Sequence, residues 1–547
     1  MALSKEAYQA LESIVGPQNI SDDPALCDSY AFQWLSETVR PEQSKFMPRP
    51  AAALMPGSTE EIQAIVKACN KYKIKVKPYS TGWYFYCAPQ KDTDDTIQLD
   101  LRRMDRILEI NEKNMYVVVE PYAICATVQA ELMKRGLNLN VTGAGTSTSP
   151  LASATSYSGP GPSTFRMGHN SENLLAMEWV TPSGEIIKTG SLGSEAGWFC
   201  GEGPGPSVRG ICRGARGARG GMGVYTKCAL KLTHWPGPPD LPVKGTVPAY
   251  RSAIPDNFRA YSLAFPSWEA YAQAYYKLYD NEIGYLFHKQ YNMLGGDLGP
   301  AFWILYNDPT KTLSDIDEMA KKPEMKAFIE EMRRAFQIVM AGRSVRDIEF
   351  QDKVLDEILA ATGGWKVARM SEPDMAEFTY LYLTRLSHKH LNWVYTGGYL
   401  GTWMQVGPPD FVIQYRPFAE AGLYRDSDPG LLVQAGGDSM MGSGGSIGGG
   451  GITGFEQFVG YDPASKESIK AVIQHMHNAT RDAVAHGFAP GHETPFLQIG
   501  MTDAELQQKY AAASQPLLFQ FQGKIKKMLD PNDVGDRLYT TLPENRT

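Results

Sequence analysis

The sequence predicts an α+β protein built from two domains. Its 547 residues exceed what one compact core usually organises. Residues 50–235 alternate between helical and strand-like hydrophobic patterns. The segment 235–242 (WPGPPDLP) then contains four prolines, which neither a helix nor a central strand accommodates. We therefore expect an N-terminal domain over residues 1–237 and a second domain that begins at residue 238.

The composition is that of an ordinary soluble globular protein, with 43% hydrophobic and 21% charged residues. The net charge of −7 argues against a nucleic-acid partner, because a phosphate backbone calls for clustered Lys and Arg. The seven cysteines form no C-x-x-C motif, which disfavours a disulfide framework, an iron–sulfur cluster or a zinc finger. The N-terminus lacks an export signal, and no apolar run reaches membrane-spanning length. A cytoplasmic protein without a membrane span is therefore expected.

The first half of the chain has the clearest periodic patterns. Residues 59–72 (TEEIQAIVKACNKY) place their apolar side chains on one helical face, with Thr59 as the expected N-cap. Residues 167–190 predict two strands joined by a turn that contains Pro182 and Gly184. The other elements expected here are strands at 96–101, 115–122 and 220–232, and a helix at 126–135 closed by Gly136.

The second half is aromatic-rich near the boundary and more ambiguous beyond it. The expected helices lie at 314–318, 325–340, 346–359 and 465–487, and the expected strands near 378–386, 395–405, 411–416 and 455–463. A basic cluster precedes the boundary. Its four arginines would share one helical face, which is typical of a solvated surface or a subunit contact: Arg209, Arg213, Arg216 and Arg219.

The turn Lys77-Pro-Tyr-Ser-Thr-Gly-Trp83 joins a helix to a strand and leaves polar groups available. Ser80 and Thr81 carry hydroxyls, and the missing Cβ at Gly82 lets the backbone approach an anion such as a pyrophosphate. Most turns of this composition are only turns. The later segment 142–161, rich in Gly, Ser and Thr, also has two interpretations: a flexible linker, which its composition alone favours, or a second binding loop.

The order of these motifs resembles the vanillyl alcohol oxidase and 4-cresol dehydrogenase flavoprotein family. The resemblance rests on PYSTG, on D-L-x-x-M-x-x-I-L-E-I-N at 100–111, on V-V-V-E-P, on Gly143-Ala-Gly-Thr-Ser147 and on M-E-W-V-T-P-S-G-E-I-I-K-T-G at 177–190. It implies a PCMH-type FAD-binding domain plus an antiparallel-sheet cap domain for the substrate. It also implies a cap over 238–500 and a C-terminal segment, 501–547, that returns to the FAD domain.

The resemblance further implies which residues contact FAD. They are Pro78, Tyr79, Ser80, Thr81, Gly82, Trp83, Gly143, Gly145, Thr146, Ser147, Ser153, His169, Asn170, Gly223 and Val224. The family's covalent attachment position matches 454–455, where this chain has no nucleophile. Noncovalent FAD is therefore expected, with Cys87 or Tyr395 as alternative tethers.

The residues for catalysis are less well matched. Relatives that act on 4-alkylphenols bind the phenolate with tyrosines and an arginine, but residues 487–495 hold no Tyr-Arg pair. His492 is the first candidate base, because imidazole titrates near neutral pH, and Glu493 would tune or replace it. Tyr86 and Tyr395 are candidate substrate donors, with aromatic packing as the alternative. No metal site is expected, because His388 and His390 lack nearby acidic or cysteine partners.

Three functions remain open at this point. The first is hydride removal from a benzylic, phenolic or alcohol C–H of a small organic substrate, with electrons passed to oxygen or to a protein acceptor such as a cytochrome. The second is a 2-hydroxy-acid dehydrogenase of the glycolate or D-lactate type, with Arg385 and Arg416 binding the carboxylate. The third is an FAD-holding electron-transfer subunit without its own substrate. A homo-oligomer is expected for each.

Overall fold

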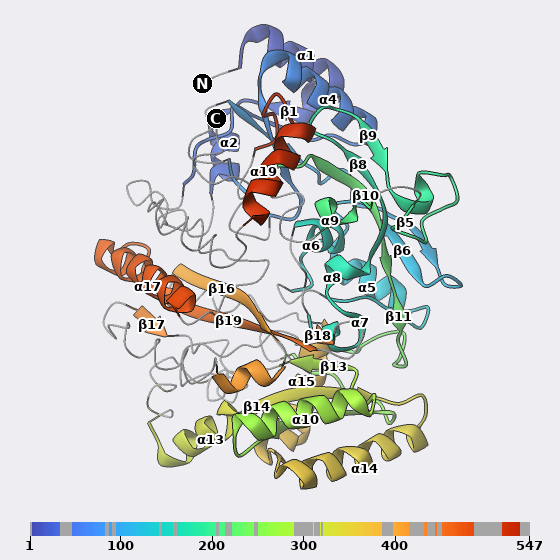
Figure 1. Cartoon of the computed structure of the whole chain (residues 1–547), viewed down its shortest axis with the longest axis vertical. Coiled ribbons are helices and arrows are strands. Elements are labelled where there is room, and N and C mark those ends of the chain that lie inside the picture. Colours follow the sequence, from blue (N-terminus) through green and yellow to red (C-terminus); the bar gives the residue numbers. More distant parts are fainter. Residues whose placement is uncertain are drawn as a thin grey trace.

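The computed structural model shows an elongated chain with its N-terminal domain at one end and part of the second domain at the other (Figure 1). The described residues are 3–32, 46–82, 87–89, 95–141, 145–156, 159, 161–203, 207–213, 221–245, 250–288, 310, 315, 318, 321–385, 398–407, 409–414, 432–434, 444–445, 451–485 and 517–536. No helix within these ranges is long and apolar enough to cross a bilayer.

A four-stranded sheet with a parallel centre forms one half of the N-terminal domain. Its order is β1 (Ile20–Ser21), β2 (Ala52–Leu54), β4 (Thr96–Asp100) and β3 (Lys75–Tyr79), with β4 parallel to both neighbours. Helices α1 (Lys5–Val15), α2 (Pro24–Ala31) and α4 (Thr59–Tyr72) accompany it. Helix α4 buries its apolar face against the sheet, as its periodicity predicted.

The predicted N-cap of α4 is wrong by one residue. The hydroxyl of Ser58 accepts from the N–H of Glu61, so Ser58 is the cap. Thr59 instead donates to Oε1 of Glu178 at 2.6 Å. Glu178 lies on the second sheet, so Thr59 joins the two halves of the domain.

That second sheet has five antiparallel strands. Its order is β5 (Ile107–Asn111), β6 (Tyr116–Val119), β10 (Val224–Lys231), β8 (Leu174–Val180) and β9 (Ile186–Lys188). The predicted hairpin is confirmed as β8–β9, with Gly184 at φ 85° in its turn. The remaining elements are α5 (Cys125–Met133), β7 (Leu137–Asn138), α6 (Pro150–Ser156), α7 (Thr164–Met167), α8 (Asn170–Asn173), α9 (Arg209–Cys212) and β11 (Thr233–His234).

The basic cluster does not form the predicted helical face. Helix α9 ends at Cys212, and Arg213 continues in an extended conformation. Arg209 is turned inward with only 17% of its side chain exposed, and it donates to the carbonyl of Glu172 at 3.0 Å and to that of Leu174. Arg216 and Arg219 lie outside the described residues.

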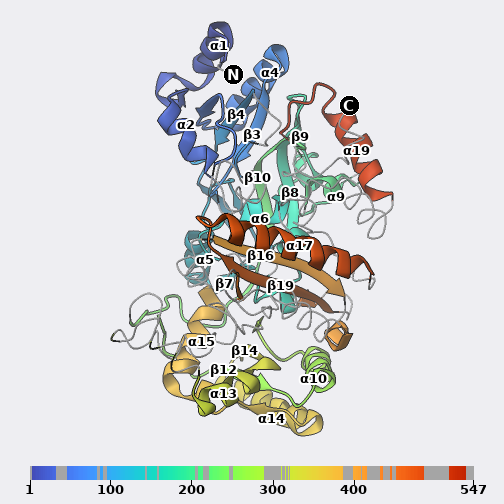
Figure 2. The ribbon, with the colours of Figure 1, turned by 90° about the vertical axis from the view of Figure 1, so that its left-hand side faces the viewer.

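The described part of the second domain contains two antiparallel sheets. The first has the order β13 (Leu286–His288), β14 (Ala335–Ala341), β12 (Phe258–Ala264) and β15 (Trp365–Lys366), with α10 (Trp268–Asp280), α13 (Pro323–Arg333) and α14 (Val345–Thr362) beside it. The second pairs β19 (Gly451–Tyr461) with β16 (Gly398–Gly407), β17 (Leu432–Gln434) and β18 (Gly444–Gly445). Figure 2 shows α17 (Lys466–Ala485) lying over β16 and β19.

Three predictions for this domain are wrong. The expected helix at 325–340 is α13 followed by strand β14, because the apolar run AFQIVMA pairs with strands on both sides. The expected strand at 378–386 belongs to helix α15 (Pro373–Arg385), which is buried almost all round and so lacks an amphipathic period. The described part of 411–416 is also helical, at η8 (Pro409–Phe411) and the turn after it.

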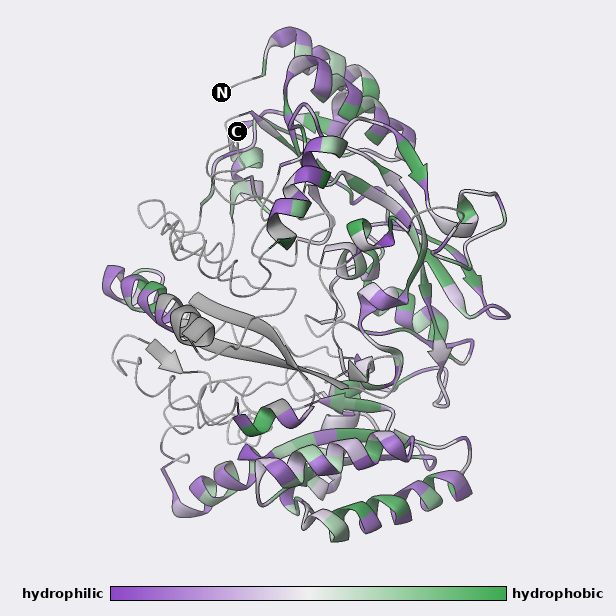
Figure 3. Ribbon diagram, viewed as in Figure 1, coloured by the Kyte–Doolittle hydropathy of each residue, from purple (hydrophilic) through white to green (hydrophobic). Residues whose placement is uncertain are grey.

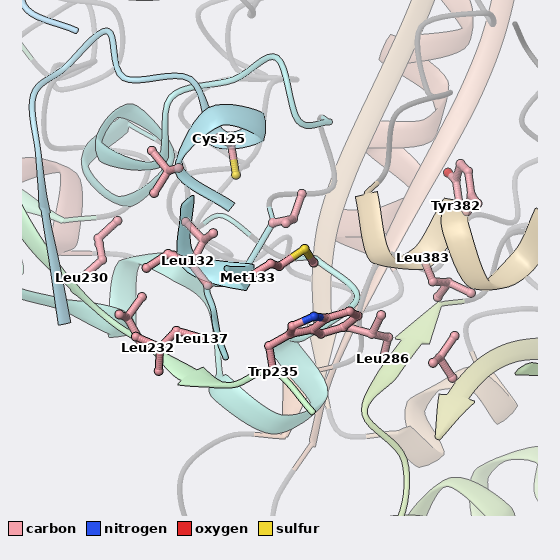
Figure 4. Packing of buried hydrophobic residues seen from close by; sticks show 14 of the residues in the cluster. Cys125, Leu132, Met133, Leu137, Leu230, Leu232, Trp235, Leu286, Tyr382 and Leu383 are labelled. Atoms are coloured by element: carbon pink, nitrogen blue, oxygen red, sulfur yellow. The ribbon is translucent and has the colours of Figure 1, made fainter. Parts of the chain in front are cut away.

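The hydrophobic core is continuous across the proline-rich boundary. The indole of Trp235 is 3% exposed and lies between Met133 of the first domain and Leu286 of the second (Figure 4). Tyr382 and Leu383 of α15 belong to the same cluster. The outer helices α10 and α14 alternate hydrophilic and hydrophobic residues along their length, as expected for helices with one face in solvent (Figure 3). The two domains are therefore packed through a shared apolar interface.

Candidate functional site

The first predicted loop follows directly from β3. Tyr79 ends the strand opposite Asp100, and the hydroxyl of Ser80 donates to the carbonyl of Pro121. Gly82 has φ 69°, and a Cβ at this position would overlap the hydroxyl of Tyr79. Only glycine therefore fits at position 82 without displacing Tyr79.

A buried carboxylate, Asp100, holds the side chains that pack against the loop. Asp100 is fully buried and accepts hydrogen bonds from the hydroxyl of Tyr30 at 2.7 Å and from Nε of Arg102 at 2.8 Å. Burial, followed by the bond to Asp100, raises the pKa of Tyr30 well above its usual range. Burial also raises the pKa of Tyr79, whose ring meets Tyr30 edge to face at 5.4 Å. Both phenols therefore stay protonated at neutral pH and act as rigid supports.

The second predicted loop closes the start of α5. The N–H of Cys125 donates to the carbonyl of Thr148, and that of Ala126 to the carbonyl of Thr146, each at 2.8 Å. The hydroxyl of Thr148 donates to the carbonyl of Gly145 at 2.7 Å. The first loop bonds to Pro121, four residues before Cys125. The structure therefore brings the two loops, far apart in sequence, to the same short segment.

The predicted contacts Ser153, His169 and Asn170 are all buried. The side-chain amide of Asn170 donates to the hydroxyl of Ser153 and, at 3.0 Å, to the carbonyl of Pro150. The backbone N–H of His169 donates to Glu172 in the capping box of α8. Ser153 and Asn170 thus fasten α6 to α8.

Sequence reasoning missed Asn140, which organises the segment after the second loop. Its amide nitrogen donates to the carbonyl of Gly159 at 2.9 Å, and its amide oxygen accepts from Ser163 at 2.6 Å. The only sequence signal was a polar residue that interrupts an apolar strand pattern.

A pocket opens between the two sheets of the N-terminal domain. Its cavity volume is about 10 Å³, which is room for one water molecule. Its lining is glycine backbone, proline and valine: Val66, Val76, Pro78, Pro182, Gly221, Gly223, Val224, Val534 and Gly535. Three of these, Pro78, Gly223 and Val224, were predicted contacts. The pocket is apolar, whereas the loop Pro78–Gly82 beside it offers the hydroxyl of Thr81 and backbone N–H groups.

Several candidates lie outside the described residues. These are Trp83, Tyr86, Gly143, Tyr395, Arg416, His492 and Glu493. Cys87 is described and half-buried, and its carbonyl accepts from the amide of Gln98 at 2.9 Å.

Arg385, at the end of α15, reaches from the second domain toward the second loop. Its guanidinium donates to the carbonyl of Ala126 at 3.4 Å, and the N–H of the same residue bonds to Thr146. Burial lowers the pKa of Arg385 below its usual range. No carboxylate pairs with it within the described ranges. An arginine so placed offers donors to an anion from outside the chain.

Comparison with known proteins identifies the cofactor domain. A family model described as an FAD binding domain matches residues 50–190. The chain is 22% identical over 235 residues to glycolate oxidase subunit GlcD of Bacillus subtilis, which covers 43% of this chain and 46% of that protein. It is 27% identical over 239 residues to 1'-carboxy-chondrochloren decarboxylase of Chondromyces crocatus, and this match covers 42% of this chain and 41% of that protein. The chain therefore matches less than half the length of these relatives.

Two solved structures resemble the whole chain in fold. p-Cresol methylhydroxylase with substrate bound superimposes with a TM-score of 0.70 at 16% identity, covering 98% of this chain and 96% of that one. 4-Ethylphenol oxidase from Gulosibacter chungangensis also gives 0.70, at 17% identity, covering 99% and 98%.

These findings confirm the predicted fold class, an α+β protein with a PCMH-type FAD-binding domain, and the predicted cofactor, FAD. The residues present fit that cofactor. The turn at Gly82, where a Cβ would not fit, brings backbone N–H groups and the hydroxyl of Thr81 together, and such a loop suits a pyrophosphate.

Proposed function

We propose that this protein is an FAD-dependent oxidoreductase that removes a hydride from a benzylic, phenolic or alcohol-type C–H of a small organic substrate. The observation that supports it best is the likeness in fold to p-cresol methylhydroxylase and 4-ethylphenol oxidase over nearly the entire chain. The two curated relatives match less than half of this chain, and by name one is an oxidase subunit and the other a decarboxylase. The FAD domain alone therefore does not select the reaction.

Bound FAD would accept the hydride at its N5 atom. The loop Pro78–Gly82 would hold the pyrophosphate with its N–H groups and the hydroxyl of Thr81, while the hydroxyl of Ser80 fixes the loop to Pro121. The loop Gly145–Ser147 would line the rest of the cofactor, because it shares the segment 121–126 with the first loop.

Substrate chemistry needs a proton acceptor when an alcohol becomes a carbonyl. We assign this role to His492, with Glu493 tuning its pKa, and substrate donation to Tyr86 and Tyr395. These assignments rest on sequence, as does the closer membership in the vanillyl alcohol oxidase family. Noncovalent attachment of FAD is part of the same proposal.

Anaerobic mixing with a substrate panel tests the proposal. Alkylphenols, benzylic alcohols and 2-hydroxy acids would each be added to the holoprotein, and the flavin absorbance followed. We expect an alkylphenol or a benzylic alcohol to bleach it. Failure of all three classes would reject the enzyme assignment and favour an electron-transfer subunit.

Arg385 supports a second candidate, a 2-hydroxy-acid dehydrogenase, as does the similarity to a glycolate oxidase subunit. Its guanidinium lies at the start of α5, which the second loop also contacts, without a carboxylate partner among the described residues. In this case a 2-hydroxy acid would bleach the flavin, and Arg385→Met would raise the KM for the acid about 10- to 150-fold, since a charge-assisted pair contributes about 1.5–3 kcal/mol. An unchanged KM would exclude Arg385 as the carboxylate ligand.

A further inference from the structure

Helix α19 (Leu518–Leu529) lies on the outside of the N-terminal domain, and its buried face carries a charged pair (Figures 1 and 2). The ammonium of Lys526, in a residue 3% exposed, donates to the carbonyls of Gly221 at 2.6 Å and Gly535 at 3.1 Å and to the carboxylate of Asp530 at 2.5 Å. Removing a buried charge from its partners is costly. This pair therefore fixes which face of the helix points outward.

The opposite face of α19 is apolar and exposed. Leu517, directly before the helix, is 72% exposed, Phe521 is 60% exposed and Met528 is 69% exposed. Their spacing of four and seven residues places them on one helical face. Lys524 lies on the same face between Phe521 and Met528 and is exposed as well. Exposed apolar side chains that gather on one face, with polar groups at the rim, mark an interaction surface.

The charge on this face is positive. The twelve residues of α19 include three lysines and no acidic residue. Asp530 neutralises Lys526, which leaves Lys524 and Lys527, both exposed. This local positive charge contrasts with the net charge of −7 of the whole chain. Helix α14 differs, because it exposes Phe350 among residues in which acidic side chains outnumber basic ones. The combination of apolar and cationic side chains is therefore a feature of α19 and not of exposed phenylalanines in general.

We propose that this protein binds to membrane surfaces that contain anionic lipid through the outer face of α19. This face consists of Leu517, Phe521, Lys524, Lys527 and Met528. Its apolar side chains enter the boundary between headgroups and acyl chains, and its lysines contact lipid phosphates, so the helix lies in the plane of the membrane surface. The methylene stem of Lys524 covers apolar surface while its ammonium reaches the headgroups.

A second copy of this chain fits the outer face less well than lipid does. In a two-fold symmetric dimer the same patch lies on both subunits. Lys524 and Lys527 of one copy would then lie close to the same lysines of the other copy, with no acidic residue of either helix to neutralise them. Anionic lipid supplies the missing negative charge.

Flotation of the full-length protein with vesicles tests the inference. The vesicles would contain phosphatidylcholine alone or phosphatidylcholine with phosphatidylglycerol. We expect wild type to float only with the anionic vesicles. Phe521→Ser should weaken that binding about 10-fold, because burial of a large apolar side chain contributes at least that factor. Replacing Lys524 and Lys527 by glutamine should weaken it about 30-fold, since each lysine near an anionic surface contributes about fivefold.

Phe350→Ser on α14 is the matched control, because Phe350 is 64% exposed and has the same side chain as Phe521. This control should bind anionic vesicles as wild type does. Met528→Ser, at a more exposed position, provides a second variant should Phe521→Ser not fold.

Three results would overturn the inference. The first is wild-type protein that floats with neither kind of vesicle. The second is equal binding of wild type, Phe521→Ser and Met528→Ser to anionic vesicles. The third is a wild-type dimer in analytical ultracentrifugation that Phe521→Ser converts to a monomer, because the outer face would then be a contact between two copies of this chain.

Discussion

Gly82→Ala probes the first cofactor loop where the structure leaves least room. Gly82 has φ 69°, a left-handed conformation that costs an L-residue about 1–2 kcal/mol. The added Cβ would also overlap the hydroxyl of Tyr79, whose ring is held against Tyr30. The loop would relax to another conformation in the cofactor-free protein, and FAD would have to restore it. An energy of 1–2 kcal/mol then corresponds to a rise in the Kd for FAD of about 5- to 30-fold.

The assay is a titration of apoprotein with FAD followed by flavin fluorescence. Gly197→Ala is the matched control, because Gly197 also has a positive φ, 95°, but open space around its Cβ position. Both variants introduce backbone strain, but only Gly82→Ala disturbs the loop Pro78–Gly82. Equal Kd values for Gly82→Ala and Gly197→Ala would refute the assignment of the loop to the cofactor.

Three further predictions concern stability, catalysis and attachment. Hydrogen bonds from Lys227 and Thr59 outweigh burial and hold the pKa of Glu178 below its ordinary value of 4.5. The stability that Glu178 contributes is present above its unfolded pKa and is lost as the pH falls through the lower folded pKa. Glu178→Gln should therefore reduce the free energy of unfolding at neutral pH and make that free energy less dependent on acid pH. Urea titrations at several pH values measure both effects, and curves identical to wild type would contradict the prediction. His492→Asn should lower turnover about 10²- to 10⁴-fold with normal FAD content, and full activity would exclude His492 as the base. Cys87→Ser should keep its flavin as wild type does, whereas selective loss of an acid-resistant flavin would establish a thioether.

The amphipathic and capped elements were predictable from sequence. Helices α4, α14 and α17 and the hairpin β8–β9 follow from hydrophobic period and turn chemistry. Helix α15 was mistaken for a strand because it is buried on nearly every side, which removes the polar face that distinguishes a helix. Strand β14 was mistaken for a continuation of α13 because its pairing partners, not its own residues, select the extended form.

The candidate site was predictable only where its residues are local. The loop Pro78–Gly82 is recognisable from sequence because hydroxyl-bearing residues and a glycine lie within five residues. The C-terminal wall of the pocket depends on contacts such as Lys75 with Asp533, which are 458 positions apart. Asn140 was also missed, because a buried asparagine that organises loops has the same local pattern as any polar interruption of a strand.

The visible absorption spectrum of the purified protein, before and after acid precipitation, tests the central claim most directly. FAD held noncovalently between the two sheets of the N-terminal domain predicts a yellow protein that releases FAD, identified by chromatography, into the supernatant. A colourless protein that takes up no added FAD would contradict the account.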